Sequence, residues 1–367
     1  AAAQARSQTR YLFDGYRDLL PLVGSSVKDI CQLEQYVRLK SHADPYFNTA
    51  LGPGYMDMGG PTAATAEVGA YFPEGAVVNV TGLAIVPNQA TGFVKSYPGE
   101  DPAQNPGRVF KPIVEAGPYL LTTYYPTDNK TGLDPAVRVA DWNWRGSEIR
   151  SEAQYGMEVL KKRLEGLGSS LANIVNYTLF LADPADLFEF DEVVRDALGE
   201  AAPSRTVVPA RGFANPRREG AFGHEQGAPR LELQVRCLRP GRGAGKVVVP
   251  GPGAGFGYQS AGVRAGPLLW TSSLFADDGP RGTEQEVETI LRQLDAICHN
   301  AGTSLSNLLR LRALVAEPAD ALAVYAALRR AVPSDPPAVA VVAVGSPLWV
   351  SGRSVALDAV ACVERSQ

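Results

Sequence analysis

Two residues of this chain, Arg205 and Glu232, have side chains that could act together on a small acidic molecule. The planar guanidinium of an arginine offers two parallel N–H donors that match a carboxylate, and it keeps its charge at neutral pH. A glutamate can position a water molecule and transfer a proton. Arg205 follows Pro203 by two residues, and Glu232 lies in the strand-like segment LELQVRCL that begins at Leu231.

The chain contains one stretch of sequence three times. The copies are GSSVKDICQLEQYVRLKSHADPYF from Gly24, GSSLANIVNYTLFLADPADLFEF from Gly168 and GTSLSNLLRLRALVAEPADALAVY from Gly302. An internal period of this kind indicates repeated domains. It also allows the three copies to be compared position by position.

This comparison singles out the middle copy. At the position of Arg205, the first and third copies have the uncharged residues Ala63 and Val339. At the position of Glu232, the same two copies have Asn79 and Ala356. Because both chemically active side chains are kept in one copy only, we expect that copy to carry the functional site.

The elements that would position these side chains follow the same order in every copy. An amphipathic helix, with apolar residues at i, i+3 and i+4, ends at the glycine that opens each repeat. A β-rich run, a second helix, a strand that begins with proline and a closing strand follow. Alternating helices and strands in this order predict a sheet with helices packed on one face.

The second and third copies also have a leading hairpin with a Gly-Pro turn. These hairpins are IVEAGPYLLTTYY from Ile113 and GVRAGPLLWTSS from Gly262. The first copy has no room for one, because AAAQARSQTRYLF is already the start of its helix. We therefore expect an exposed sheet edge, which an N-terminal fragment or a second chain would complete.

The pattern resembles the RidA/YjgF family of imine and enamine deaminases, also described as endoribonuclease L-PSP-like. The resemblance rests on SLANIVNYTLFLADPADLFEF, on the segment PSRT from Pro203 and on the segment LEL from Leu231. It implies an α+β fold of tandem RidA/YjgF-like (chorismate-mutase-like) domains, each a mixed sheet with two helices packed on one face. Because family members are trimers with sites between subunits, it also implies an internal pseudo-trimer.

The expected domains are two complete copies and one partial copy. Residues 1–97 form a partial domain without its hairpin, residues 105–238 form the domain with the retained site, and residues 247–365 form a degenerate domain.

The resemblance also implies roles for individual residues. Arg205 would hold the carboxylate of a 2-imino acid, and Glu232 would orient and deprotonate water. The predicted substrate-binding residues are Arg205, Phe110, Thr123, Tyr124, Phe180 and Thr206. Ser272 and Ser273 of the third copy keep the small residues that the family has at the end of its hairpin, so the cleft could combine two copies. Two insertions, PAVRVADWNWRGSEI and GFANPRREGAFGHEQGAP with His224, are typical of lids or specificity loops.

The predicted function is hydrolysis of the imine or enamine of a small carboxylate-bearing metabolite, with release of ammonia. This chemistry needs no cofactor, and the three histidines have no metal-ligand spacing. A chorismatase-like or other small-carboxylate-converting enzyme on the same fold stays open, although such an enzyme would carry its glutamate where the third copy has Ala356. A non-catalytic ligand-binding or scaffold protein stays open as well.

Composition sets further bounds on the class of protein. The chain has 367 residues, 45% of them hydrophobic, and a net charge of −4, which argues against a nucleic-acid surface. No apolar run approaches the roughly 20 residues that span a bilayer, and no signal peptide opens the chain. Four irregularly spaced cysteines do not form a disulfide framework, so we expect a cytoplasmic protein. A homo-oligomer stays open.

Overall fold

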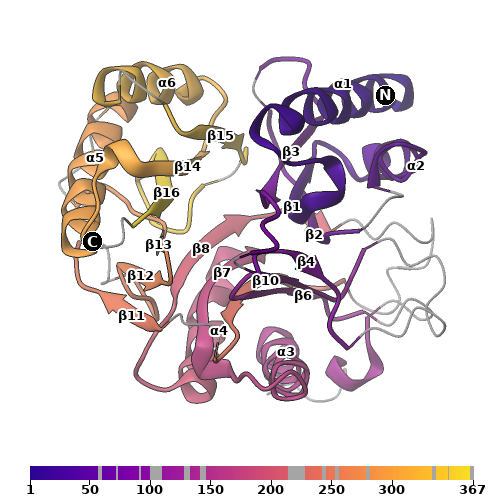
Figure 1. Cartoon of the computed structure of the whole chain (residues 1–367), viewed down its shortest axis with the longest axis vertical. Coiled ribbons are helices and arrows are strands. Elements are labelled where there is room, and N and C mark those ends of the chain that lie inside the picture. Colours follow the sequence, from indigo (N-terminus) through magenta and orange to yellow (C-terminus); the bar gives the residue numbers. More distant parts are fainter. Residues whose placement is uncertain are drawn as a thin grey trace.

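The structure is a computed structural model of the whole chain. It describes residues 1–363 except for positions 57–59, 72, 91, 100–109, 128–132, 141–145, 214–227, 242–244, 253–255, 278–281, 333–335 and 346. Three mixed sheets form within the described residues, one for each repeat. Figure 1 shows the strands turned toward the centre of the molecule and the helices on the outside, which confirms the predicted α+β fold and internal pseudo-trimer.

Each repeat has the predicted order of helices and strands. The first consists of α1 (Ala2–Leu19), β1 (Ile30–Val37), α2 (Ala43–Ala50), β2 (Thr62–Glu67) and β3 (Val78–Ala84). The second consists of β5 (Ile113–Ala116), β6 (Tyr119–Tyr124), α3 (Glu148–Glu165), β7 (Ile174–Leu181), α4 (Leu187–Leu198), β8 (Ser204–Pro209) and β10 (Leu231–Leu238). The third consists of β12 (Gly262–Ala265), β13 (Leu268–Thr271), α5 (Thr283–Asn300), β14 (Leu308–Val315), α6 (Asp320–Ala331), β15 (Ala338–Ala343) and β16 (Val355–Cys362).

The repeat glycines end the first helix of each repeat, or the short 3-10 turn that follows it, as the sequence predicts. Gly24, Gly168 and Gly302 have φ values of 76°, 73° and 78°. This left-handed conformation is open to glycine without the steric cost that a Cβ brings.

Strand order is the same in each sheet where the elements exist. The second sheet runs β4-β5-β6-β10-β7-β8 and the third runs β11-β12-β13-β16-β14-β15. The first sheet runs β3-β1-β2-β9, so β3 has no hairpin beside it among the described residues. Two short strands belong to a sheet outside their own predicted domain. Strand β4 (Lys95–Ser96) joins the second sheet, and β9 (Gly212–Phe213) joins the first. Strand β11 (Lys246–Val249) forms the edge of the third sheet.

Strand register confirms the equivalence of the compared positions. Leu33, Tyr177 and Leu311 are equivalent residues of β1, β7 and β14, and they face Ala63, Arg205 and Val339. In the same way, Tyr36, Phe180 and Leu314 face Asn79, Glu232 and Ala356.

The apolar core is divided between the repeats and the centre. Each repeat has its own cluster between its sheet and its helices. A further cluster fills the space between the three inner sheet faces, with contributions from Tyr36, Phe180 and Leu314. We call the face of each sheet that meets this cluster its inner face, and the opposite face its helix face.

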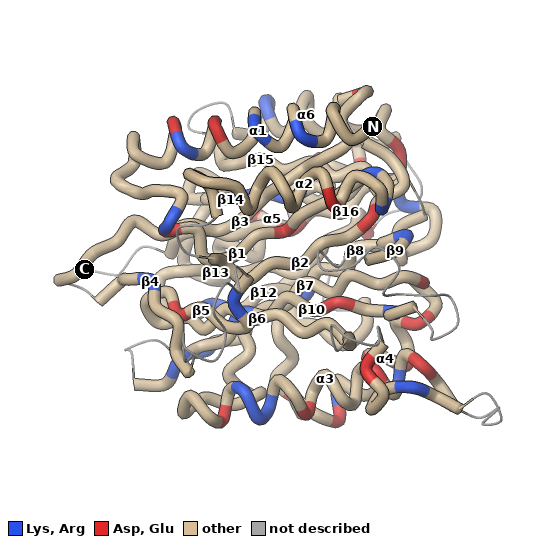
Figure 2. Tube along the Cα trace, turned by 90° about the vertical axis from the view of Figure 1, so that its right-hand side faces the viewer, with Lys and Arg blue, Asp and Glu red and all other residues tan. Residues whose placement is uncertain are grey.

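Charge does not form a single-sign surface on the side that Figure 2 shows. Lysines, arginines and acidic residues are mixed along α1, α6 and α3 there. Within the described part of the chain, no helix is both long and apolar enough to cross a membrane.

Candidate functional site

Arg205 lies on β8 with its side chain fully buried. Its Nη1 pairs with the carboxylate of Asp191, and its Nη2 donates to the carbonyl oxygen of Phe256 (2.9 Å). Its Nε donates to Oε1 of Gln259 (3.3 Å), and the guanidinium lies 5.6 Å from the ring centroid of Trp349. Each of the three guanidinium nitrogens therefore already has a partner within the protein.

The third repeat faces Arg205. The backbone N–H of Arg205 donates to Oγ of Ser272 (2.8 Å), and the N–H of Ser273 donates to the carbonyl oxygen of Arg205 (2.8 Å). These two serines follow directly after β13. The interface at Arg205 is thus formed by β8 of the second repeat and the hairpin end of the third.

The third repeat also contacts Asp191. Its Oδ2 accepts a hydrogen bond from the backbone N–H of Tyr258 (2.9 Å). The preceding residue, Gly257, has φ of +83°, and a Cβ there would lie 2.3 Å from Oδ2 of Asp191 and 2.8 Å from Nη2 of Arg205. The third-repeat loop therefore presses its backbone onto the ion pair, and only glycine fits.

The ion pair is a feature of the second repeat and has no counterpart in the third. Asp191 precedes Arg205 by 14 residues. The same spacing before Val339 leads to Tyr325 (339 − 14 = 325), so the third repeat lacks both partners. Joint presence of the acid and the base in the second repeat indicates that they act as a unit.

Glu232 lies on β10 and contacts the first repeat. Its Oε2 accepts a hydrogen bond from the backbone N–H of Thr65 on β2 (3.2 Å). Burial raises the pKa of Glu232 well above its ordinary value of 4.5, and the bond from Thr65 offsets only part of this rise. Burial also raises the pKa of Tyr125 well above its ordinary value, and the charge that Glu232 would carry adds to the rise. The site thus holds a carboxyl group that favours its neutral form beside a tyrosine.

The structure does not bring Arg205 and Glu232 together, contrary to the single-site hypothesis. Among the described residues, no hydrogen bond or ion pair joins them, and Arg205 is not among the groups that shift the pKa of Glu232. Strand β7 lies between their strands. Arg205 faces Tyr177 on β7 and Glu232 faces Phe180, three residues further on. Since successive side chains alternate between the faces of a sheet, Arg205 lies on the helix face and Glu232 on the inner face.

Phe180 and Thr206 share the inner face with Glu232. Phe180 is fully buried, and its ring centroid lies 6.1 Å from that of Tyr36. The buried hydroxyl of Thr206 has no hydrogen-bond partner among the described residues. Thr123 also lies on this face, because it pairs with Gln234, two residues from Glu232.

Tyr124 and Phe110 lie elsewhere, so the prediction that they line the site is not supported. Tyr124 points into the second-repeat core, where its hydroxyl donates to the carbonyl oxygen of Glu152 (3.0 Å). Phe110 packs against the first-repeat core, with its ring centroid 5.8 Å from that of Phe47. Alternation along β6 turns Tyr124 away from the inner face and Thr123 toward it.

The sequence did not single out Asp191, Gln259, Trp349 or Tyr125 as partners of the predicted residues. Asp191 comes from α4 of the second repeat, and Gln259 and Trp349 come from loops of the third repeat. No local sequence pattern therefore links them to Arg205. Tyr125 follows Thr123 by two residues, and strand alternation is a signal that could have placed it beside Glu232. His224 lies outside the described residues. Within those residues, no group of three or more His, Cys, Asp and Glu side chains could hold a metal ion.

Comparison with known proteins gives partial matches, each about a third of this chain in length. No family model matches. A RutC family protein of Pyrococcus horikoshii is 28% identical over 107 residues, which cover 29% of this chain and 77% of that protein. RidA from the Antarctic bacterium Psychrobacter sp. PAMC 21119 is 20% identical and covers 32% of this chain and 99% of its own, with a TM-score of 0.30. Rv2704, a YjgF/YER057c/UK114 family member from Mycobacterium tuberculosis, is 24% identical and covers 32% of this chain and all of its own, with a TM-score of 0.30. The sequence match and the three repeated sheets confirm the resemblance that the motifs indicated: this chain consists of tandem repeats and is similar to proteins of the RidA/YjgF family.

Proposed function

We propose that this chain is a RidA-type hydrolase that acts on the imine or enamine of a small metabolite, with Glu232 as its acid–base group. The observation that carries the proposal is the buried carboxyl group of Glu232, whose pKa is raised by its position between the first and second repeats. Strongly perturbed carboxyl groups in interdomain clefts are typical of functional sites. The hydroxyl of Thr206 is a further polar group on the same face.

The addition of water to the imine needs one proton to leave Glu232 and one proton to return to it. Neutral Glu232 donates its proton to the imine nitrogen, which makes the adjoining carbon more electrophilic. The resulting carboxylate accepts a proton from the water molecule that adds to this carbon. The hydroxyl proton of the carbinolamine then moves to its amino nitrogen as the C–N bond breaks, which releases ammonia and leaves the carbonyl compound, so atoms and charge balance.

Arg205 has a different role in this proposal from the one that the sequence predicted. Its guanidinium is engaged with Asp191 and with the third repeat, so it joins two repeats and does not hold the substrate. At the equivalent position on β2, two residues before the Thr65 that contacts Glu232, the first repeat has Ala63. The substrate therefore need not carry a carboxylate.

The test is ammonia release from small imines generated in situ by oxidation of amino acids with and without a carboxylate. Replacing Glu232 with Gln should lower kcat/KM about 100-fold or more. Glu286→Gln is a matched control, because Glu286 is also buried and accepts a hydrogen bond from the backbone N–H of Ser354 (3.0 Å), yet lies in the third repeat. Full activity of the Glu232→Gln variant would refute the role of this residue, and a rate no higher than the background in the unsubstituted protein would refute the proposed reaction.

A second candidate is a non-catalytic ligand-binding or scaffold protein. The engagement of Arg205 with Asp191 and with the third repeat favours it, because these contacts involve the group that a carboxylate-specific enzyme would use. This candidate predicts that a bound ligand raises the melting temperature of the unsubstituted protein and of Glu232→Gln equally, without turnover.

A further inference from the structure

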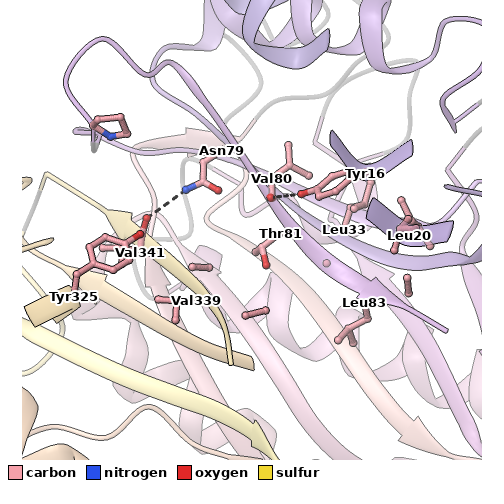
Figure 3. A pocket seen from close by; sticks show the side chains of 16 residues that line it. Tyr16, Leu20, Leu33, Asn79, Val80, Thr81, Leu83, Tyr325, Val339 and Val341 are labelled. Carbon is pink, nitrogen blue, oxygen red and sulfur yellow. Dashed lines mark hydrogen bonds between the residues drawn. The ribbon is translucent and has the colours of Figure 1, made fainter. Parts of the chain in front are cut away.

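A cavity of about 400 Å³ lies between the first and third repeats (Figure 3). Its walls include six consecutive residues of the first repeat, 79–84, and four consecutive residues of β15, 338–341. Successive side chains of a strand point to opposite faces of a sheet. Six consecutive residues can therefore line one cavity only if it runs along the edge of β3.

The edge of β3 that faces the cavity has no neighbouring strand among the described residues. The equivalent strands β10 and β16 are flanked by β6 and β13. All residues of β10 are buried, whereas only Val78 and Val80 are buried in β3. One backbone group on the edge of β3 has a side-chain partner, since the hydroxyl of Tyr16 donates to the carbonyl oxygen of Val80 (2.6 Å).

The opposite wall is the strand equivalent to β8. In the second repeat, β8 is wholly buried and exchanges hydrogen bonds with Ser272 and Ser273 after the third-repeat hairpin. In β15, the first three residues are exposed or half-buried. Between the two walls, Nδ2 of Asn79 donates to the carbonyl oxygen of Val341 (3.3 Å). Incomplete burial thus occurs on both strands that border the cavity.

We propose that this groove binds a β-hairpin of another polypeptide, which adds to the edge of β3. The other two repeats are the template, since β5–β6 and β12–β13 fill the equivalent places beside β10 and β16. Those two hairpins pack in one apolar cluster with Cys31 and Ile85 of the first repeat. None of the described residues that line the cavity is charged. The partner strand therefore presents uncharged, mainly apolar side chains and pairs with the backbone of residues 79–84.

The probe for the test is a fluorescently labelled, cyclised peptide with the sequence of residues 262–273, the third-repeat hairpin. We expect saturable one-to-one binding to the full chain and slower hydrogen exchange of the β3 amides in the complex. Leu83→Lys and Val339→Lys place a charge on either wall and should each weaken binding about tenfold or more. Leu322→Lys, on the exposed face of α6, is the matched control and should leave binding unchanged.

A second form of the peptide separates strand pairing from unspecific apolar contact. N-methyl groups on the outward amides of its second strand remove the donors that β3 would use, and binding should be lost. N-methyl groups on the outward amides of the first strand should leave binding intact. Absence of saturable binding, equal binding of both methylated peptides, or a dimer of the free protein with protected β3 amides would each overturn the proposal. The last result would show that a second copy covers the edge. Since none of these readouts involves turnover, they are independent of the proposed hydrolase activity.

Discussion

Asp191 and Arg205 form an ion pair that is closed from outside by a loop of the neighbouring repeat. Asp191 comes from α4 and Arg205 from β8 of the second repeat, and Gly257 and Tyr258 of the third repeat cover them. The pair therefore serves two purposes at once: it fixes a helix on its sheet, and it offers a surface on which the third repeat docks.

Removing one partner of this pair should destabilise the protein strongly. Arg205→Ala leaves the carboxylate of Asp191 buried without its cation, and loss of one partner of a buried pair costs about 3–5 kcal/mol. The double variant Arg205→Met with Asp191→Leu should lose much less, because no uncompensated charge remains. Urea unfolding of the single variants Arg205→Met and Asp191→Leu and of the double variant measures the coupling between the two side chains. A loss for Arg205→Ala no larger than that of an exposed-surface substitution would contradict a structural role.

Gly257→Ala should disturb the same interface. The new methyl group would overlap with Asp191 and Arg205, and alanine rarely adopts a φ of +83°. The control is Gly352→Ala, where φ is +74° and no atom lies within 4 Å of the added Cβ. The control should lose about 1–2 kcal/mol from backbone strain alone, and Gly257→Ala should lose more. Equal shifts in the urea midpoint for Gly257→Ala and Gly352→Ala would show that the neighbouring side chains move away from the new methyl group without loss of stability.

Glu34 should make the association of the three repeats sensitive to acid. Its carboxylate lies 2.8 Å from Nη2 of Arg236 in the second repeat and 2.6 Å from Nη1 of Arg312 in the third. Burial by itself would raise the pKa of Glu34, but Arg312, Arg310 and Arg236 together hold it below the ordinary value of 4.5. The stabilisation is therefore present above this ordinary value and is lost as the pH falls through the lowered pKa.

The variant Glu34→Gln tests this. Near neutral pH it should lose about 3–5 kcal/mol of unfolding free energy, because buried guanidinium groups lose their counter-charge. Unfolding free energies measured from neutral pH down to acid pH should also fall less steeply in the variant. Glu317→Gln, a surface substitution, is the control and should follow the unsubstituted protein. Parallel acid profiles for Glu34→Gln and the unsubstituted protein would contradict the prediction.

Glu152 should give stability the opposite dependence on pH from that caused by Glu34. Burial raises the pKa of this α3 residue to about 8, despite hydrogen bonds from the backbone N–H groups of Arg230 and Leu231. The unfolded chain ionises near 4.5, whereas the folded protein keeps the proton up to about 8. Stability should therefore fall as the pH rises between these two values. Glu152→Gln should flatten this slope in urea unfolding measured across the interval, and an unchanged slope would show that Glu152 is ionised in the folded protein.

The amino-acid sequence by itself determined the repeats and the course of the chain within each of them. The glycines at positions 24, 168 and 302, the helical spacing before them and the strand patterns after them are local signals, because they arise from backbone conformation and from the burial of one face. The equivalence of Arg205 with Ala63 and Val339 followed from the repeat alone. That β3 has no hairpin beside it among the described residues was also expected from the sequence.

Which side chains meet depends on how the repeats pack in three dimensions. Arg205 and Glu232 are retained in the same repeat, yet they lie on opposite faces of the sheet and contact different repeats. Asp191 lies far along the chain from the third-repeat loop that covers it, and no local pattern marks this contact. The role of a carboxylate or a guanidinium depends on the groups that surround it after packing, and many of these groups come from distant parts of the chain. Because three similar sheets surround one centre, each interface is formed by a different pair of repeats.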